Sequence, residues 1–219
     1  MIKSNNKIEL RGTCAAAPAV SHSGKEEIFY IFPMTVQRLS GAEDTINVVV
    51  REASLDKEII YEGARLRILG EIRSFNNKSG SGNKLVITVF AKKVERTDGA
   101  DSNSAELTGT ICKAPVLRIT PMGREICDIM LAVNRRYGRS DYLPCITWGR
   151  MANKAAQWTV GTRVELEGRL QSREYIKTSD GVSVQKTAFE VSASEIEKIP
   201  DKKTPDTEVP GETELIQQA

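Results

Sequence analysis

The chain carries one motif pattern twice, at an almost constant spacing. Glu-Leu-x-Gly-Thr occurs at residues 9–13 and again at 106–110, an offset of 97. A second match is a pair of glycines seven residues apart. It occurs as Gly63 and Gly70 in the first copy and as Gly161 and Gly168 in the second, an offset of 98. Spacing this regular marks two copies of one domain. A chain of 219 residues is long enough for two domains of about 100 residues, each able to bury a core.

Polar segments divide the chain around these copies. Residues 97–104 contain no apolar residue except alanine, which is typical of a linker. The segment after 199 has three prolines, is acidic and lacks aromatic residues, so it cannot bury enough apolar surface to order itself. We therefore expect an N-terminal domain at 1–98, a linker at 99–104, a second domain at 105–199 and a disordered acidic tail at 200–219.

Apolar residues alternate with a period of two through most of each copy, which predicts β-strands. Ile28, Tyr30, Phe32, Met34 and Val36 share one face in the first copy, and Cys127, Ile129, Leu131 and Val133 do so in the second. One helix per copy is predicted from Met151, Ala155 and Trp158, and from Leu55 and Ile59. The order of three strands, a helix and two strands predicts an all-β chain of two tandem five-stranded OB-fold barrels, each with one short helix.

Composition excludes several classes of function. No apolar run approaches the length of a membrane span, and the first residues lack the apolar region of a secretion signal, so we expect a cytoplasmic protein without membrane contact. Four scattered cysteines without a C-x-x-C pair, and a single histidine, predict no metal site and no cofactor. No nucleophile motif or Walker-type loop occurs, so we expect no enzymatic activity.

Arginine and aromatic residues alternate in the second copy. Binding of a single strand needs cations along the phosphates and flat rings on which unpaired bases stack. Such residues gather at predicted strand ends and along the last hairpin, where an OB-fold has its groove. The candidates for nucleic-acid binding are Arg118, Arg135, Arg136, Tyr137, Trp148, Arg150, Arg173, Tyr175 and Lys177.

Residues 104–199 resemble the bacterial single-stranded DNA-binding protein family nearly end to end. The resemblance rests on Leu-Ala-Val-Asn-Arg-Arg-Tyr at 131–137, Cys-Ile-Thr-Trp at 145–148 and Gly-Arg-Leu-Gln-Ser-Arg-x-Tyr at 168–175. It implies sequence-nonspecific binding of unpaired DNA in replication, repair or recombination.

The resemblance also implies roles for individual residues and for assembly. Trp148 and Tyr175 take the base-stacking positions of the family, while Arg135, Arg136 and Arg173 take phosphate-facing ones. The family usually assembles four OB-folds, so two per chain imply a homodimer. Its acidic tail recruits replication and repair proteins, and this chain keeps only an acidic segment followed by two aliphatic residues.

The first copy departs from this pattern. Arg51 stands where the second copy has Trp148, and Arg38, Arg73 and Phe75 are its best remaining groove candidates. The first copy either binds weakly or serves mainly as an assembly partner.

Structural roles for the candidate binding residues also stay open. Trp148 could be a half-buried sheet residue, and Tyr137 and Tyr175 could cap a barrel rim. Two alternative functions also remain: a primosome-type accessory protein, or an OB-fold assembly module that acts through protein contacts.

Overall fold

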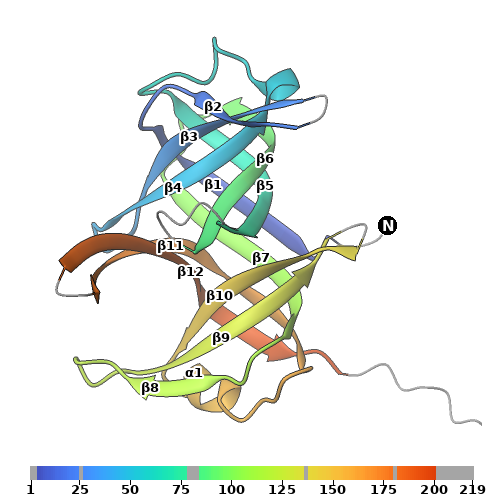
Figure 1. Cartoon of the computed structure of the whole chain (residues 1–219), viewed down its shortest axis with the longest axis vertical. Helices are drawn as coiled ribbons and strands as arrows, with labels where there is room; N and C mark the ends of the chain where they lie inside the picture. Colours follow the sequence, from blue (N-terminus) through green and yellow to red (C-terminus); the bar gives the residue numbers. More distant parts are fainter. Residues whose placement is uncertain (1–3, 25–26, 78–83, 136–137, 180–181, 201–219) are drawn as a thin grey trace, which may run out of the picture.

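A computed structural model describes residues 4–24, 27–77, 84–135, 138–179 and 182–200, which are predominantly β-strand as predicted (Figure 1). The N-terminal half consists of β1 (Asn6–Cys14), β2 (Ala19–Ser23), β3 (Ile28–Gln37), β4 (Glu43–Arg51), the 3-10 helix η1 (Glu52–Ser54), β5 (Arg65–Asn76) and β6 (Leu85–Arg96). The C-terminal half consists of β7 (Ser102–Ile111), β8 (Val116–Ile119), β9 (Glu125–Asn134), β10 (Ser140–Trp148), α1 (Arg150–Ala155), β11 (Arg163–Ser179) and β12 (Val182–Lys198). No helix in these ranges is long and apolar enough to cross a membrane.

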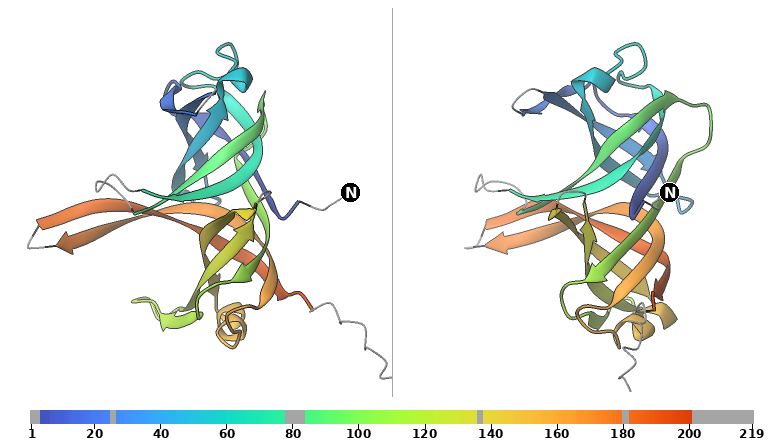
Figure 2. Two further views of the ribbon diagram at one scale, coloured as in Figure 1. Left: turned by 45° about the vertical axis from the view of Figure 1, so that its right-hand side comes forward. Right: turned by 90° about the vertical axis from the view of Figure 1, so that its right-hand side faces the viewer.

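Strand pairing is the same in the two halves. In the N-terminal half, β1 pairs with β5, β5 with β6, β6 with β4, β4 with β3, and β3 returns to β1. In the C-terminal half, β7, β11, β12, β10 and β9 are connected in the same cyclic order. β2 and β8 extend the sheets as partners of β3 and β9. The two strand groups lie one above the other along the long axis, and the β11–β12 hairpin projects from the body (Figures 1 and 2).

The predicted core faces are confirmed by burial. Phe32, Met34 and Val36 of β3 are buried, and so are Cys127 and Leu131 of β9. Their neighbours along each strand point away from the core because side chains alternate across a strand. Each strand group therefore has a dry inner face and an accessible outer face.

The predicted helices are shorter than the apolar spacing indicated. α1 ends at Ala155, and Trp158 packs against the core just beyond it. In the N-terminal half, Leu55 and Ile59 also pack against the core, but Leu55 caps η1 and Ile59 lies in a turn beyond it. The Asp56 carboxylate accepts a hydrogen bond from the backbone N–H of Glu58 at 2.9 Å, so a turn replaces the expected helix.

Two of the repeated glycines permit a close backbone approach. The pairing register shifts beside Gly70 in β5 and beside Gly168 in β11. A Cβ atom at either glycine would lie 2.3 Å from a carbonyl oxygen, that of Phe90 or of Ser192. Only glycine fits this contact, which explains why the spacing repeats.

The halves are joined by pairing between two copies of the same strand. β1 and β7 pair antiparallel, with Ile8 opposite Ala105. These two residues are equivalent in the repeat, so the junction is nearly two-fold symmetric. β7 begins at Ser102, so residues 102–104 of the predicted linker are strand. Their polar side chains did not suggest a strand, but pairing with β1 satisfies their backbone groups.

A buried carboxylate ties the first half to the second. Asp44 is 1% exposed and accepts a hydrogen bond from Nε of Arg38 at 2.7 Å. The same carboxylate accepts the backbone N–H of Ser172 at 2.7 Å, and Arg38 donates to the Ser172 carbonyl at 3.1 Å. The hydrogen bond to Asp44 raises the pKa of Arg38 above its ordinary value.

The second half makes the same contact with the first. Asp141, 0% exposed, accepts Nε of Arg135 at 2.7 Å and the backbone N–H of Ser74 at 2.6 Å. Arg135 donates to the Ser74 carbonyl at 3.0 Å. Asp141 also forms an ion pair with Arg73 at 3.1 Å. Among the described residues, Asp44 has no second arginine partner of this kind. We call these two contacts the reciprocal ion pairs.

Two asparagines brace the strands beside this junction. The Asn6 side chain donates to the Ile72 carbonyl at 2.8 Å and accepts its backbone N–H at 2.9 Å. Asn103 does the same for Leu170, at 2.6 and 3.0 Å. Each asparagine substitutes for a missing strand partner.

Replacing Asn6 tests this bracing. We expect Asn6→Ala to lower the free energy of unfolding by about 2 kcal/mol, because buried N–H and C=O groups of Ile72 lose their partners. Lys7→Ala, the control, removes an exposed ion pair to Glu106 and is expected to cost under about 1 kcal/mol. Urea denaturation measures both. Equal losses of unfolding free energy in the two variants would contradict a bracing role for Asn6.

Candidate nucleic-acid interface

The outer face of the C-terminal half carries Trp148 at the end of β10. The ring is half-buried, and its Nε1 donates to Oγ of Ser192 on β12 at 3.1 Å. Ser192 lies opposite Arg169 of β11. Because residues directly opposite each other share a face, Trp148 lies on the same face as Arg169 and every second residue beyond it.

That alternation brings Arg173 and Tyr175 onto the same face. Pairing between β11 and β12 has no register shift from Arg169 to Tyr175. The Cζ atom of Arg173 lies 5.7 Å from the centroid of the Tyr175 ring, a cation-π contact. Arg173 is exposed and Tyr175 half-buried. Arg169 marks the level of Trp148 on β11. With about 3.3 Å per residue, Tyr175 lies roughly 20 Å along the strand from Arg169, so the rings of Trp148 and Tyr175 would contact different parts of a ligand.

β8 and β9 extend this face on the other side of Trp148. Ile126 of β9 lies opposite both Trp148 and Arg118 of β8. The guanidinium of Arg118 binds Asp128 two residues along β9, with Nη2 at 3.0 Å from the carboxylate. The hydrogen bond to Asp128 raises the pKa of Arg118 above its ordinary value. We call the outer face of β8, β9, β10, β12 and β11 the C-terminal wall.

The structure says less about the other predicted binding residues of the second copy. Arg150 is exposed at the start of α1, directly after the strand that carries Trp148. Arg136 and Tyr137 lie outside the described residues. Lys177 lies in β11, but its side chain falls outside the described part of the structure.

Three predicted arginines, Arg38 and Arg73 of the first copy and Arg135 of the second, have carboxylate partners within the protein. Arg38 and Arg135 form the reciprocal ion pairs with Asp44 and Asp141. Arg73 pairs with Asp141 and also with Glu71. Arg135, expected to face phosphate, thus has its guanidinium bound to Asp141 and to the Ser74 carbonyl. Asp141 is close to Arg135 in sequence, but both bind the backbone of Ser74 in the other half, and local sequence does not reveal that contact.

The equivalent face of the N-terminal half is rich in rings. Phe29 of β3 stacks on His22 of β2, with ring centroids 4.6 Å apart and 8° between the planes. The Phe90 ring of β6 lies 6.4 Å from Phe29, and the Cζ atom of Arg51 lies 5.4 Å from the Phe90 centroid. Phe75 of β5 is 54% exposed. We call the outer face of β2, β3, β4, β6 and β5 the N-terminal wall.

Sequence comparison of the copies missed most of this wall. Phe75 was predicted, but Phe29 and Phe90 stand where the second copy has Ile126 and Ser192, so no motif marks them. The available signal was alternation: Phe29 falls on the face opposite the core residues of β3. A large ring on the outer face of a strand is a candidate contact residue.

Three of the four cysteines, Cys14, Cys127 and Cys145, belong to the core. Cys14, Cys127 and Cys145 are buried and Cys112 is half-buried, all as free thiols. Burial raises the pKa of each thiol. Among the residues that the structure describes, no group of three His, Cys, Asp or Glu side chains could hold a metal ion.

Sequence comparison identifies the source of the motifs in the second copy. Residues 102–199 match the model of the Single-strand binding protein family. The resemblance predicted from sequence is confirmed. The single-stranded DNA-binding protein A of Bacillus subtilis is 36% identical over 80 residues, which cover 33% of this chain and 46% of that protein. Single-stranded DNA-binding protein 2 of Listeria innocua is 35% identical over 89 residues, or 37% and 55% of the two chains. The chain thus spans about half the length of these curated relatives.

Solved structures show that the fold extends over both halves. A deletion variant of the single-stranded DNA binding protein from Thermus aquaticus superimposes with a TM-score of 0.74, covering 94% of this chain and all of that one at 21% identity. The wild-type protein gives a TM-score of 0.73, covering 91% and 95% at 20% identity. The similarity includes the N-terminal half, which the family model does not cover.

The reciprocal ion pairs generate a prediction about stability. We expect Arg38→Ala to lower the free energy of unfolding by about 3 kcal/mol or more, because Asp44 stays buried without its cation. Arg135→Ala should cost less, since Asp141 retains Arg73. Arg150→Ala, an exposed control, should stay within about 0.5 kcal/mol of the unsubstituted protein. Chemical denaturation ranks the three. An unchanged stability in Arg38→Ala would show that this arginine is free for another role.

Proposed function

We propose that the chain binds single-stranded DNA without sequence preference through its C-terminal wall. The observation that carries the proposal is that Arg118, Trp148, Arg173 and Tyr175 share one face across five strands. The family match over residues 102–199 and the names of the relatives support the same ligand.

The wall supplies the two interactions that a flexible strand can use. Stacking of a base on Trp148 or Tyr175 is worth about 1 to 3 kcal/mol and works for every base. Arginines beside the rings neutralise phosphates, which makes binding weaken as salt rises. A duplex hides its base faces and cannot use the rings, so the unpaired strand is preferred. The proposed activity is binding and protection during replication, repair or recombination, without catalysis.

The organisation of the chain follows from the same proposal. We infer two OB-fold domains, one within 1–98 and one that begins with β7 at Ser102 and ends at 199, joined at 99–101, with an acidic tail at 200–219 that contacts replication or repair proteins. Two chains would form a homodimer with four OB-folds. Such a protein would act in the cytoplasm, where bacterial DNA lies.

Trp148 gives the direct test. We expect Trp148→Ala to bind oligo(dT) roughly 5- to 100-fold more weakly, because one stacking contact is lost. Trp158→Phe is the matched control: this ring packs against the core, so affinity should hold while quenching by DNA persists from Trp148. Fluorescence titration at several salt concentrations measures both variants.

The opposite outcome of that titration has a clear meaning. Absence of binding to unpaired DNA in the unsubstituted protein would overturn the proposal and favour a primosome-type accessory or assembly role. Quenching that persists in Trp148→Ala and disappears in Trp158→Phe would move the site to the helix side of the domain.

The pair between Arg118 and Asp128 yields a second prediction. Asp128→Asn removes the carboxylate that neutralises Arg118, leaving its charge available to phosphate. We expect tighter binding at low salt and a slope of log affinity against log salt that steepens by about one. Glu195→Gln, an exposed carboxylate on β12, is the control for net charge. A change of equal size in both variants would mean that Arg118 makes no local contact.

A further inference from the structure

The β11–β12 hairpin, which carries Arg173 and Tyr175, leaves the body of the second half as two strands (Figure 2). In the described residues, β11 pairs with β7 only from Arg163 to Gly168, whereas it pairs with β12 along its whole length. A two-stranded hairpin is marginally stable in water without further support. The direction in which Arg173 and Tyr175 point therefore depends on what holds the base of the hairpin.

Side chains take the place of a third strand at that base. Asn103 of β7 bonds both the N–H and the C=O of Leu170. Two residues farther along, the first half binds both backbone groups of Ser172: the N–H donates to Asp44 at 2.7 Å, and the C=O accepts from Arg38 at 3.1 Å. Oγ of Ser172 also donates to the Asp44 carboxylate at 3.3 Å. Because alternate residues present their backbone groups to the same edge of a strand, these contacts support one continuous edge of β11.

The contact that lies nearest to the binding residues is the one supplied by the other half of the chain. Ser172 directly precedes Arg173 and lies three residues before Tyr175. A crevice of about 1030 Å³ lies between the hairpin and strands β4 and β6, with Ser172 and Glu174 on one side and Thr45 on the other. Since this crevice is open, the hydrogen bonds at Ser172 hold the hairpin to the first half where continuous apolar packing does not.

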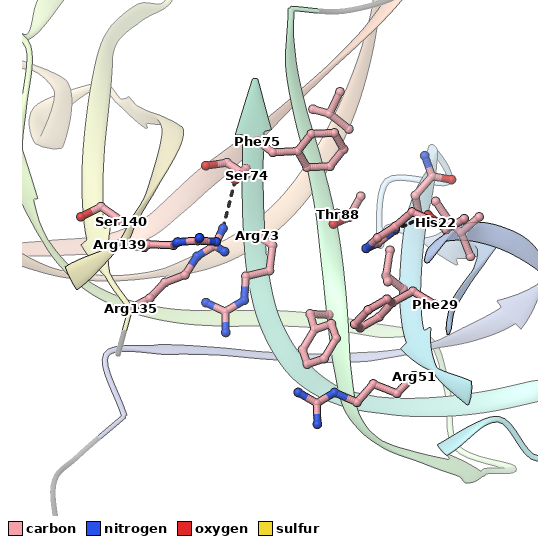
Figure 3. Close-up of a pocket in the computed structure, with 16 residues that line it drawn as sticks. His22, Phe29, Arg51, Arg73, Ser74, Phe75, Thr88, Arg135, Arg139 and Ser140 are labelled. Carbon is pink, nitrogen blue, oxygen red and sulfur yellow. Dashed lines mark hydrogen bonds between the residues drawn. The ribbon is translucent and has the colours of Figure 1, made fainter. Parts of the chain in front are cut away.

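The equivalent contact on the other side of the molecule has a further support. Arg135 and Asp141 bind Ser74 in the same way, and the dashed line in Figure 3 joins Arg135 to the Ser74 carbonyl. The backbone N–H of Tyr142 also donates to Oγ of Ser74 at 2.7 Å. That hydrogen bond does not depend on either charged side chain. The contact at Ser74 is therefore a natural control for the contact at Ser172.

We propose that Arg38 and Asp44 of the first half are positioning residues for single-strand binding by the second half. By holding the backbone of Ser172, they aim Arg173 and Tyr175 along the C-terminal wall. The inference rests on the proposed function, because it concerns the residues to which DNA binding is assigned there. Neither positioning residue contacts the DNA. The first half thus contributes to binding through the hairpin of the other half.

A double-mutant cycle tests this role in anisotropy titrations with fluorescent oligo(dT). Asp44→Asn keeps the size of the side chain and removes the charge that binds Arg38 and the Ser172 N–H. We expect it to weaken binding by about 3- to 10-fold, because part of one stacking contact is lost. In a Tyr175→Ala background it should weaken binding by under about twofold, because the ring that it positions is gone. In a Trp148→Ala background it should keep its full effect.

A matched control separates positioning from a general effect of losing a buried carboxylate. Asp141→Asn removes the carboxylate of the other ion pair, and its effect on affinity should be the same with and without the Tyr175 ring. Arg38→Lys replaces Asp44→Asn if that variant melts near the assay temperature. It keeps a charge beside Asp44, but an ammonium lacks the planar fork that reaches the carboxylate and the Ser172 carbonyl together, so the same dependence on Tyr175 is expected. Circular dichroism and thermal melting establish that each variant is folded.

Hydrogen exchange without DNA reports on the hairpin directly. In Asp44→Asn we expect peptides that cover 169–176 to exchange faster than in the unsubstituted protein, because the Ser172 N–H loses its acceptor and the hairpin loses its support. Peptides from β9 should exchange as before. Unchanged exchange of the hairpin would overturn the inference.

Two other results would also overturn it while the proposed function stands. One is an effect of Asp44→Asn that is equal with and without the Tyr175 ring, which would mean that the ion pair acts only on overall stability. The other is unchanged affinity in Asp44→Asn although the hairpin exchanges faster, which would mean that binding does not need this support. Failure of the unsubstituted protein to bind unpaired DNA would refute the proposed function and this inference together.

Discussion

The arrangement of both walls depends on pairing between two copies of one strand. β1 and β7 meet antiparallel about Ile8 and Ala105, and the reciprocal ion pairs at Asp44 and Asp141 lock the approach from either side. Each ion pair lies within one half and hydrogen-bonds to a serine backbone of the other half, so separating the halves would leave the backbone groups of Ser172 and Ser74 without these partners. The duplicated chain is thereby held as one body, as a symmetric dimer would be, but without dependence on concentration.

This docking gives the duplication a functional consequence. The C-terminal wall collects Trp148, Tyr175 and Arg173 from its own strands. The N-terminal wall combines its own rings with Arg139 of the other half. Divergence of the first copy has redistributed rings and cations instead of removing them. A motif search finds the wall that keeps the family pattern and overlooks the one that does not.

Much of the fold could be predicted because its determinants are local. The repeated glycines mark the register shifts, and alternation identified the inner faces of β3 and β9. The roles of Arg38 and Arg135 could not be predicted, because the contacts that bury their partners Asp44 and Asp141 come from Ser172 and Ser74, which are distant in sequence. Trp148 shares its wall with Tyr175 as expected, whereas Phe29 lies in no family motif and was missed, although alternation places it on the outer face of β3.

Photo-cross-linking with oligo(dU) that carries a photoreactive base, followed by peptide mapping, tests the placement of the strand most directly. The account predicts adducts on the aromatics of the C-terminal wall, at Trp148 or Tyr175. Tyr61 is 47% exposed but lies outside both walls, beside Arg96. Adducts concentrated on Tyr61, with none on either wall, would contradict the account.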